Sequence, residues 1–176
     1  MDKQEIGLSS DLFNTFLEIR RSIIRESVDD IPNAEHRLES LGEFKGIEFI
    51  NDSKATNVDL TWYSLDRMTK PIIWIVGGLD EGNDYSNLDA IVKDKVKGII
   101  CLTRESQKIF HSFTNTVDLI ISVSTAEEAV RAGFAMAQKG DVVLLSPASG
   151  SFDLFDSYQD RGNKYKKAVR NLFSTL

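Results

Sequence analysis

Five short apolar runs after residue 45 constrain the fold of this 176-residue sequence more than any other feature. Each run is rich in Ile and Val and bounded by turn residues; they are GIEFIN (46–51), PIIWIV (71–76), KGIICL (97–102), VDLIIS (117–122) and DVVLLS (141–146). Continuous apolar strands of this kind are typical of a parallel sheet that is covered on both faces. Helical patterns separate the runs. The sequence therefore predicts a Rossmann-like, doubly wound α/β domain with a mostly parallel sheet.

Helix signals stand between the runs and before them. Ser124 and Glu127 have the spacing of a capping box, and Gly140 is a stop signal for the same helix. Apolar residues before Pro32 recur at helical spacing, which predicts one or two N-terminal helices. The capping candidates for these helices are Ser9, Ser10 and Asp11. We therefore divide the chain into a helical segment at 1–33 and an α/β domain at 34–176.

The stretch HRLESLGEFKGIEFIND, which follows Pro32, differs from the later runs. It alternates in a way that suits two short antiparallel strands joined near Lys45 and Gly46. This pattern predicts a short antiparallel strand at the edge of the sheet.

Composition excludes several classes of protein. A formal net charge of -6 and a pI near 5.0 argue against a nucleic-acid or anionic-membrane surface, which needs clustered Lys and Arg. No stretch approaches the roughly 18 apolar residues of a membrane span. A single cysteine, Cys101, excludes an internal disulfide and a Cys-based zinc site and fits a reducing compartment. We expect a cytoplasmic protein.

Polar segments follow all five apolar runs. In a parallel α/β sheet, ligands bind outside the carboxyl ends of the strands, where these segments gather. The segments are NDSKATN (51–57), GGLDEGND (77–84), TRES (103–106), SVST (122–125) and SPASGSFD (146–153), and three of the five are dense in Gly, Ser, Asp and Lys. They predict a ligand site at one edge of the sheet.

Each segment also has a purely structural interpretation. Asn57 could cap the helix that begins near Val58, and Asp52 could accept hydrogen bonds from loop amides. Gly77 and Gly78 could serve only a tight turn, because the loop does not match the dinucleotide fingerprint. Local chemistry leaves both interpretations open. The structural interpretation explains Lys54 least well.

Taken together, the motifs resemble those of one family. EHRLE (35–39), NDSKATN (51–57), GG with GND (77–84), LLSPASGSFDLF (144–155) and RG (161–162) occur in the order seen in the D-glutamate-adding Mur ligases. The resemblance covers roughly residues 20–176. Sister ligases carry other motifs at the first of these loops, such as DYAHTP, so NDSKATN indicates the D-glutamate-adding branch.

The resemblance also implies what this sequence lacks. A Mur ligase has a UDP-binding domain, a central ATPase domain with a GKT-type phosphate loop, and a carboxy-terminal domain that brings in the amino acid. No Gly-Lys-Thr or Gly-Lys-Ser occurs in this sequence. The resemblance therefore assigns 34–176 to the carboxy-terminal domain and 1–33 to the last helices of the central domain and the linker. We expect the chain alone to be inactive and the complete enzyme to be monomeric, with the upstream domains either removed or encoded separately.

The family reaction implies the partners. ATP phosphorylates the L-alanyl carboxylate of UDP-N-acetylmuramoyl-L-alanine, and the amine of D-glutamate then displaces phosphate to form an amide. Both steps concentrate negative charge, so they need Mg²⁺ and cationic side chains. The family's Mg²⁺ ligands lie mainly in the central domain, and we assign no metal ligand here.

Site residues follow from the resemblance position by position. Arg37 resembles the linker arginine that reaches the ATP phosphates. Asp52 resembles the aspartate that contacts the nucleotide ribose, and Lys54 resembles the lysine near the phosphates. Arg37 and Lys54 are also the expected catalytic residues. The expected D-glutamate-binding residues are Thr56, Ser151, Phe152 and Tyr158.

Two alternatives from other classes remain open. One is a non-catalytic nucleotide- or amino-acid-binding module, and the other is a docking domain whose loops are only caps. The chain also departs from the family at Glu81, where related ligases carry Lys or Arg facing the carboxylate of the amino acid. Since a second negative charge about 4 Å away would cost on the order of 4 kcal/mol at an effective dielectric constant of 20, we expect Glu81 to point away from the site.

Overall fold

The computed structural model describes residues 10–29 and 34–175 of the chain. Its elements are α1 (Ser10–Asp29), β1 (Glu39–Phe44), β2 (Ile47–Asn51), α2 (Val58–Arg67), β3 (Ile72–Val76), the 3₁₀ turn η1 (Ser86–Leu88), α3 (Asp89–Lys95), β4 (Val96–Leu102), α4 (Gln107–Phe113), β5 (Ile120–Val123), α5 (Ala126–Met136), β6 (Val142–Leu145) and α6 (Tyr158–Thr175). All five apolar runs form strands, as predicted.

The strands form one six-stranded sheet in the order β1-β2-β6-β3-β4-β5. β1 pairs antiparallel with β2, and every other neighbouring pair is parallel. The predicted mostly parallel sheet with a short antiparallel edge strand is therefore confirmed. The hairpin turns at Lys45 and Gly46, whose φ angles are 51° and 83°. Positive φ at both central residues is the conformation that a two-residue hairpin turn needs.

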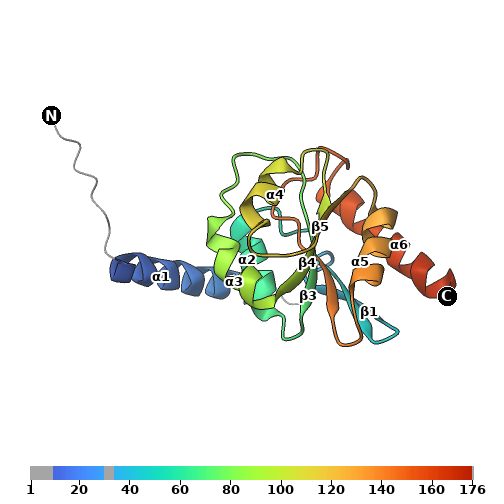
Figure 1. Cartoon of the computed structure of the whole chain (residues 1–176), viewed down its shortest axis with the longest axis horizontal. Helices are drawn as coiled ribbons and strands as arrows, with labels where there is room; N and C mark the ends of the chain where they lie inside the picture. Colours follow the sequence, from blue (N-terminus) through green and yellow to red (C-terminus); the bar gives the residue numbers. More distant parts are fainter. Residues whose placement is uncertain (1–9, 30–33, 176) are drawn as a thin grey trace. The chain divides into compact units, whose positions relative to one another are not determined.

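Helices cover both faces of the sheet, so the core has two layers. In Figure 1, α2, α3 and α4 lie on one side of the sheet and α5 and α6 lie on the other. Side chains of β3 alternate between the layers. Ile73 and Ile75 pack in the layer that includes Ala129 of α5 and Tyr165 of α6, while Trp74 contacts Phe113 of α4 edge to face at 5.5 Å. This alternation explains why the strand is apolar throughout.

Two helix signals were misread by small offsets. The capping box of α5 consists of Thr125 and Glu128, one residue after the predicted pair, and Glu128 also accepts from the Ser124 amide. The helix ends at Met136 and not beside Gly140, which instead lies in the following turn with φ of 97°. Both TAEE and STAE offer a capping spacing, and only the position of the packed face selects between them. The predicted cap of α2 is confirmed, because Asn57 Oδ1 accepts from the Leu60 amide at 2.9 Å.

The chain divides into two compact units, Met1–Pro32 and Asn33–Leu176. Within the first unit the structure describes α1, a single helix of 20 residues. One stripe of this helix is apolar and more than half exposed: Leu12, Phe13, Phe16, Ile19 and Ile23. No helix among the described residues is long and apolar enough to span a membrane.

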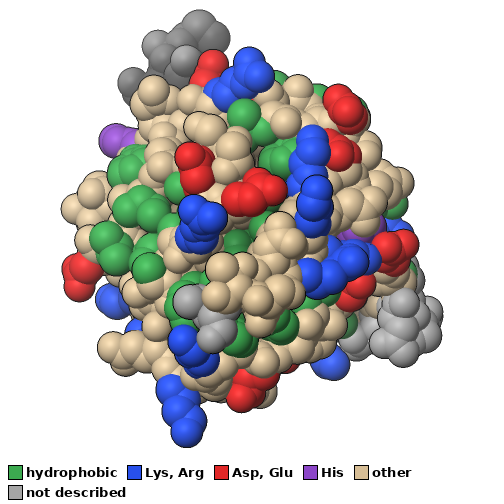
Figure 2. All heavy atoms as spheres, turned by 90° about the vertical axis from the view of Figure 1, so that its right-hand side faces the viewer, with side chains coloured by type: hydrophobic (Ala, Val, Ile, Leu, Met, Phe, Trp, Pro, Cys, Tyr) green, Lys and Arg blue, Asp and Glu red, His purple; other side chains and the backbone are tan. Residues whose placement is uncertain are grey.

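The face that carries α5 and α6 is shown in Figure 2. A groove of about 340 Å³ lies between these helices and is lined by Glu127, Val130, Arg131, Phe134, Ala168, Asn171, Leu172 and Thr175. Basic and acidic side chains are interspersed on this face and form no patch of a single sign (Figure 2).

Candidate functional site

The polar loops converge because β2, β6 and β3 are neighbours in the sheet. The Gly77 amide donates to the Pro147 carbonyl at 2.9 Å, and the Leu79 amide donates to the Gly150 carbonyl at 2.9 Å. The Ala148 amide donates to the Ala55 carbonyl at 3.0 Å. Backbone bonds thus join the three loops predicted to form the site, 51–57, 77–84 and 146–153.

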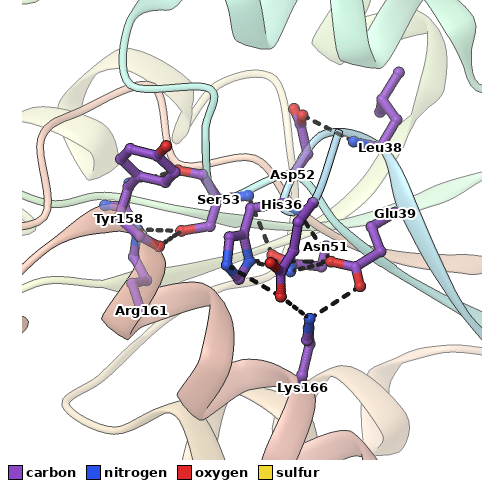
Figure 3. A network of polar contacts seen from close by, with 10 residues as sticks. His36, Leu38, Glu39, Asn51, Asp52, Ser53, Tyr158, Arg161 and Lys166 are labelled. Atoms are coloured by element: carbon purple, nitrogen blue, oxygen red, sulfur yellow. Dashed lines mark hydrogen bonds and ion pairs between the residues drawn. The ribbon is translucent and has the colours of Figure 1, made fainter. Parts of the chain in front are cut away.

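Arg161, at the start of α6, connects two of these loops through hydrogen bonds. Its Nε donates to Ser53 Oγ and its Nη2 to the Ser53 carbonyl, both at 3.0 Å, while Nη1 and Nη2 each reach the Ser149 carbonyl at 3.1 Å. Ser53 Oγ in turn donates to the Tyr158 carbonyl at 2.8 Å (Figure 3). Burial lowers the pKa of Arg161 to about 10. The guanidinium still stays charged at neutral pH, so it offers the planar fork of donors that several carbonyls need.

Gly78 is required where two of the loops touch. An added Cβ would lie 2.0 Å from the Gly150 carbonyl oxygen, and the φ of Gly78 is 151°. No side chain fits this approach, so the packing of the two loops requires glycine at position 78.

Asp52 is fully buried and its carboxylate is already bound within the domain. Oδ1 accepts from Arg37 Nη1 at 3.2 Å and from the Leu38 amide at 3.1 Å, and Oδ2 accepts from Ser64 and Ser146 hydroxyls. Burial raises the pKa of the Asp52 carboxyl above its usual value, and Arg37 and these donors offset only part of the rise. Since the carboxylate has no exposed oxygen, Asp52 here serves to orient Arg37 and the loops. Its contact with a nucleotide ribose stays a prediction.

The two terminal nitrogens of the Arg37 guanidinium differ in their contacts. Nη1 is fixed by Asp52, and the guanidinium carbon lies 5.3 Å above the ring of Tyr63. Nη2 is buried and has no hydrogen-bond acceptor among the described residues. A buried cationic donor without an acceptor is costly unless a ligand oxygen completes it. Lys54 lies in the adjoining loop, half-buried, and its amide donates to the His36 carbonyl at 3.0 Å.

The four residues expected to bind D-glutamate differ in exposure. Ser151 is buried, Thr56 and Tyr158 are half-buried, and Phe152 is 71% exposed. The Tyr158 ring meets the His36 ring edge to face at 6.1 Å. Tyr158 begins α6, and Ser151 follows Gly150, whose carbonyl accepts from Arg161 of that helix at 3.4 Å. Thr56 lies in the 51–57 loop, and the Phe152 side chain extends into solvent.

A small pocket of about 130 Å³ lies at the carboxyl ends of β3 and β4. It is lined by Gly78, Leu79, Asp80, Thr103, Arg104, Glu105 and Asp153. Thr103 Oγ1 donates to Asp153 at 2.8 Å, which joins the β4 end to the segment after Ser151. Glu81 is exposed beside this pocket and is not one of its lining residues. Its expected orientation away from the substrate stays a prediction.

Sequence reasoning missed several buried polar residues of the site. Arg161 was noted only as part of RG, and no local pattern marks it as buried. Asn51 Nδ2 donates to Glu39 at 3.0 Å and lies 2.8 Å from His36 Nδ1 (Figure 3). Nδ1 must therefore accept, which puts the imidazole proton on Nε2. Burial accordingly lowers the pKa of His36.

A parallel sheet with joined polar loops at its carboxyl edge defines an α/β ligand-binding domain. The sequence model of the family described as "Mur ligase, glutamate ligase domain" matches residues 36–149. The chain belongs to this family.

Curated relatives with the same specific name are similar to this chain over most of its length. The chain is 46% identical over 166 residues to the UDP-N-acetylmuramoylalanine--D-glutamate ligase of Christiangramia forsetii, in an alignment covering 94% of this chain and 37% of the relative. The ligase of the same name from Porphyromonas gingivalis is 46% identical over 89% of this chain and 35% of its own length. The chain thus spans little more than a third of these relatives.

Solved structures share the fold at low sequence identity. The bifunctional folylpolyglutamate synthase/dihydrofolate synthase of Yersinia pestis has a TM-score of 0.52 at 17% identity, over 98% of this chain and 36% of that one. E. coli FolC in complex with ADP has a TM-score of 0.51 at 18% identity, over 80% of this chain and 32% of that one. These likenesses concern the fold alone.

Proposed function

We propose that this chain is the carboxy-terminal domain of an ATP-dependent ligase that adds D-glutamate to UDP-N-acetylmuramoyl-L-alanine in peptidoglycan precursor synthesis. Relatives named for this reaction are 46% identical to it. The observation that carries the proposal is Arg37, whose Nη1 is fixed on Asp52 while its buried Nη2 has no acceptor in the described residues. A phosphate oxygen of ATP would complete this donor.

The reaction makes two bonds in sequence. The alanyl carboxylate attacks the γ-phosphorus of ATP, which forms an acyl phosphate and releases ADP. The D-glutamate amine then attacks the acyl carbon, and phosphate leaves as the amide forms. Arg37 and Lys54 would hold the phosphate groups and offset the charge that develops on them. Because Asp52 and the Tyr63 ring already contact Arg37 in this structure, little reorganisation is needed at that side chain.

The amino acid would bind where the loops meet α6. Thr56, Ser151 and Tyr158 would donate hydrogen bonds to its carboxylates, and exposed Phe152 would cover the bound molecule. The Arg161 network would keep the loops from separating when two negative charges enter between them.

The remaining parts of the reaction belong to regions outside this domain. No group of His, Cys, Asp and Glu suited to a metal ion occurs among the described residues, so Mg²⁺ would be held by the region that precedes the domain in the relatives. We infer that residues 1–33 are the last helix of the central ATPase domain with its linker, and 34–176 the amino-acid-binding domain. Use of ATP and a UDP-linked substrate would place the enzyme in the cytoplasm. We also propose that the complete enzyme is a monomer.

A second candidate is a binding module without catalysis. The observation that favours it is the absence of a Gly-Lys-Ser/Thr phosphate loop from these 176 residues. Such a module would bind ATP or D-glutamate by itself, whereas a docking domain would bind neither.

A chimera tests the proposal. The matching part of the Christiangramia forsetii ligase is replaced by this chain, and phosphate release is measured with ATP, D-glutamate and UDP-N-acetylmuramoyl-L-alanine. We expect turnover that requires all three substrates. Lys54→Ala should lower it by about 10- to 100-fold, since a charge-assisted contact contributes roughly 1.5–3 kcal/mol. The chain alone should release no phosphate.

Three outcomes would contradict the proposal. They are a folded chimera without D-glutamate-dependent turnover, phosphate release by the chain alone, and a Lys54→Ala variant with unchanged kinetics. In the first case, thermal-shift titration of the chain with ATP and with D-glutamate separates the binding module from the docking domain.

A further inference from the structure

The turn that carries Arg37 is strained and needs support from outside itself. His36 and Leu38, on either side of Arg37, have φ angles of 65° and 45°. For residues other than glycine such angles persist only when surrounding contacts enforce them. Local bonds supply part of this support: the His36 amide donates to Glu39 at 3.1 Å, and the Leu38 amide donates to Asp52 at 3.1 Å.

Helix α6 presents one row of side chains to this turn. Tyr158, Gly162 and Lys166 are four residues apart and therefore lie on the same face of the helix. Tyr158 meets the His36 ring, and Gly162 lets that ring approach so closely that an added Cβ would lie 2.2 Å from Nδ1. Lys166 is the next member of the row.

Lys166 binds both ends of the turn. Its Nζ lies 2.7 Å from Glu35 Oε1 and 3.0 Å from Glu39 Oε1. Figure 3 shows the Lys166 ammonium group facing Glu39. The other oxygen of Glu39 accepts from the His36 amide and from Asn51. The side chains of Lys166 and Glu39 are only 12% and 28% exposed, so water screens this ion pair less than it would on an open surface, whereas the Glu35 side chain is 66% exposed. One ammonium group thus closes the turn and connects it to the end of β2.

We propose that Lys166 is a positioning residue: it holds the 35–39 turn closed and so keeps Arg37 aimed at its ligand. Lys166 touches no reacting group in this role. Its importance for catalysis rests on the proposed function, whereas its effect on the turn does not.

Amide hydrogen exchange on the whole chain tests this role. Lys166→Met keeps the length of the aliphatic stem and removes the charge. We expect exchange at the His36 and Leu38 amides to become at least about tenfold faster, while amides of β3 and β6 change by less than about twofold. The NMR signal of the Arg37 Nε–H group should shift or broaden. Lys166→Arg should restore both readouts, and Lys167→Met, at the exposed next position, should alter neither.

Two results would overturn the proposal. Unchanged exchange at His36 and Leu38 in Lys166→Met would show that the turn closes without the lysine. An equal acceleration at every amide, β3 and β6 included, would show a general loss of stability. Because neither readout involves ATP or D-glutamate, failure of the proposed function would leave this result intact.

Discussion

Arg161 shows how much of the site depends on one side chain. It is 1% exposed and donates to a hydroxyl and to carbonyl groups from loops that come from different parts of the sequence. Arg161→Lys would keep the charge but lose the fork that reaches them together. We expect the free energy of unfolding to fall by about 3 kcal/mol, since each hydrogen bond to a charged group contributes about 1.5–3 kcal/mol. Urea denaturation measures this loss, with exposed Arg170→Lys as the control. A loss below about 1 kcal/mol in Arg161→Lys would contradict the proposed role of Arg161 in holding the loops together.

His36 predicts a dependence of stability on pH. Burial lowers the pKa of His36 below its usual 6.5; Glu35 and Glu39 oppose this, and Lys166 and Lys54 add to it. A histidine with a depressed pKa stabilises the folded state fully above pH 6.5 and loses that contribution as the pH falls through its folded pKa. The free energy of unfolding should therefore fall below pH 6.5, before most carboxylates titrate.

Denaturation at several pH values checks this dependence. His36→Gln should flatten the curve below pH 6.5, because it removes the imidazole whose pKa is lowered in the folded state. His111→Gln changes the other histidine of the sequence, which is exposed, and should leave the curve as it is. An identical slope in His36→Gln would assign the pH dependence to other groups.

At the scale of elements, α6 packs against the 35–39 turn through Gly162, Tyr158 and Lys166. Gly162 lies in the first turns of α6, where alanine would normally be favoured by roughly 0.5–1 kcal/mol. Here Gly162→Ala should instead destabilise the domain by about 1–3 kcal/mol, because its Cβ would overlap the His36 ring. Thermal denaturation measures the change, and exposed Asn163→Ala is the matched control.

A double-mutant cycle identifies the cause. If the clash with His36 is responsible, Gly162→Ala should cost much less in a His36→Ala background. An equal cost in both backgrounds would mean that the glycine is needed for another reason.

At the scale of the whole molecule, the core cluster of the α5–α6 face belongs to the second unit, while Val28 of α1 is also buried. The core cluster on the α5–α6 face includes residues from Ile47 to Val169 and none from α1. A chain that begins at Asn33 should therefore keep its melting temperature to within about 3 °C, since this change removes none of that core. It should also associate less, because the exposed apolar stripe of α1 is gone.

Calorimetry and sedimentation of the two chains test this expectation. The full chain with Leu12, Phe13, Phe16, Ile19 and Ile23 changed to Ser is the companion variant, and it should also associate less. A melting temperature lowered by more than about 10 °C in the shorter chain would show that the two units are not independent.

The sequence by itself determined the strands, the parallel sheet, the edge hairpin and the polar loops at one edge. These features depend on periodicity and turn chemistry within a few residues, which a sequence displays directly. Family motifs within the loops also marked Arg37 and Lys54. The offset at Thr125 shows the limit of this reasoning, because neighbouring residues offered two capping registers and packing selected one.

Only the tertiary structure decided which polar residues are buried against one another. Arg161 and Ser53 are 108 positions apart, and Lys166 and Glu35 are 131 apart. No local pattern relates such residues, since their meeting depends on where β6 inserts between β2 and β3 and on the path of α6 afterwards. The same long-range packing enclosed Asp52 and left the Nη2 of Arg37 without an acceptor in the described structure. Local chemistry could suggest a charged loop, but burial sets the energy of each charge, and burial is a property of the whole fold.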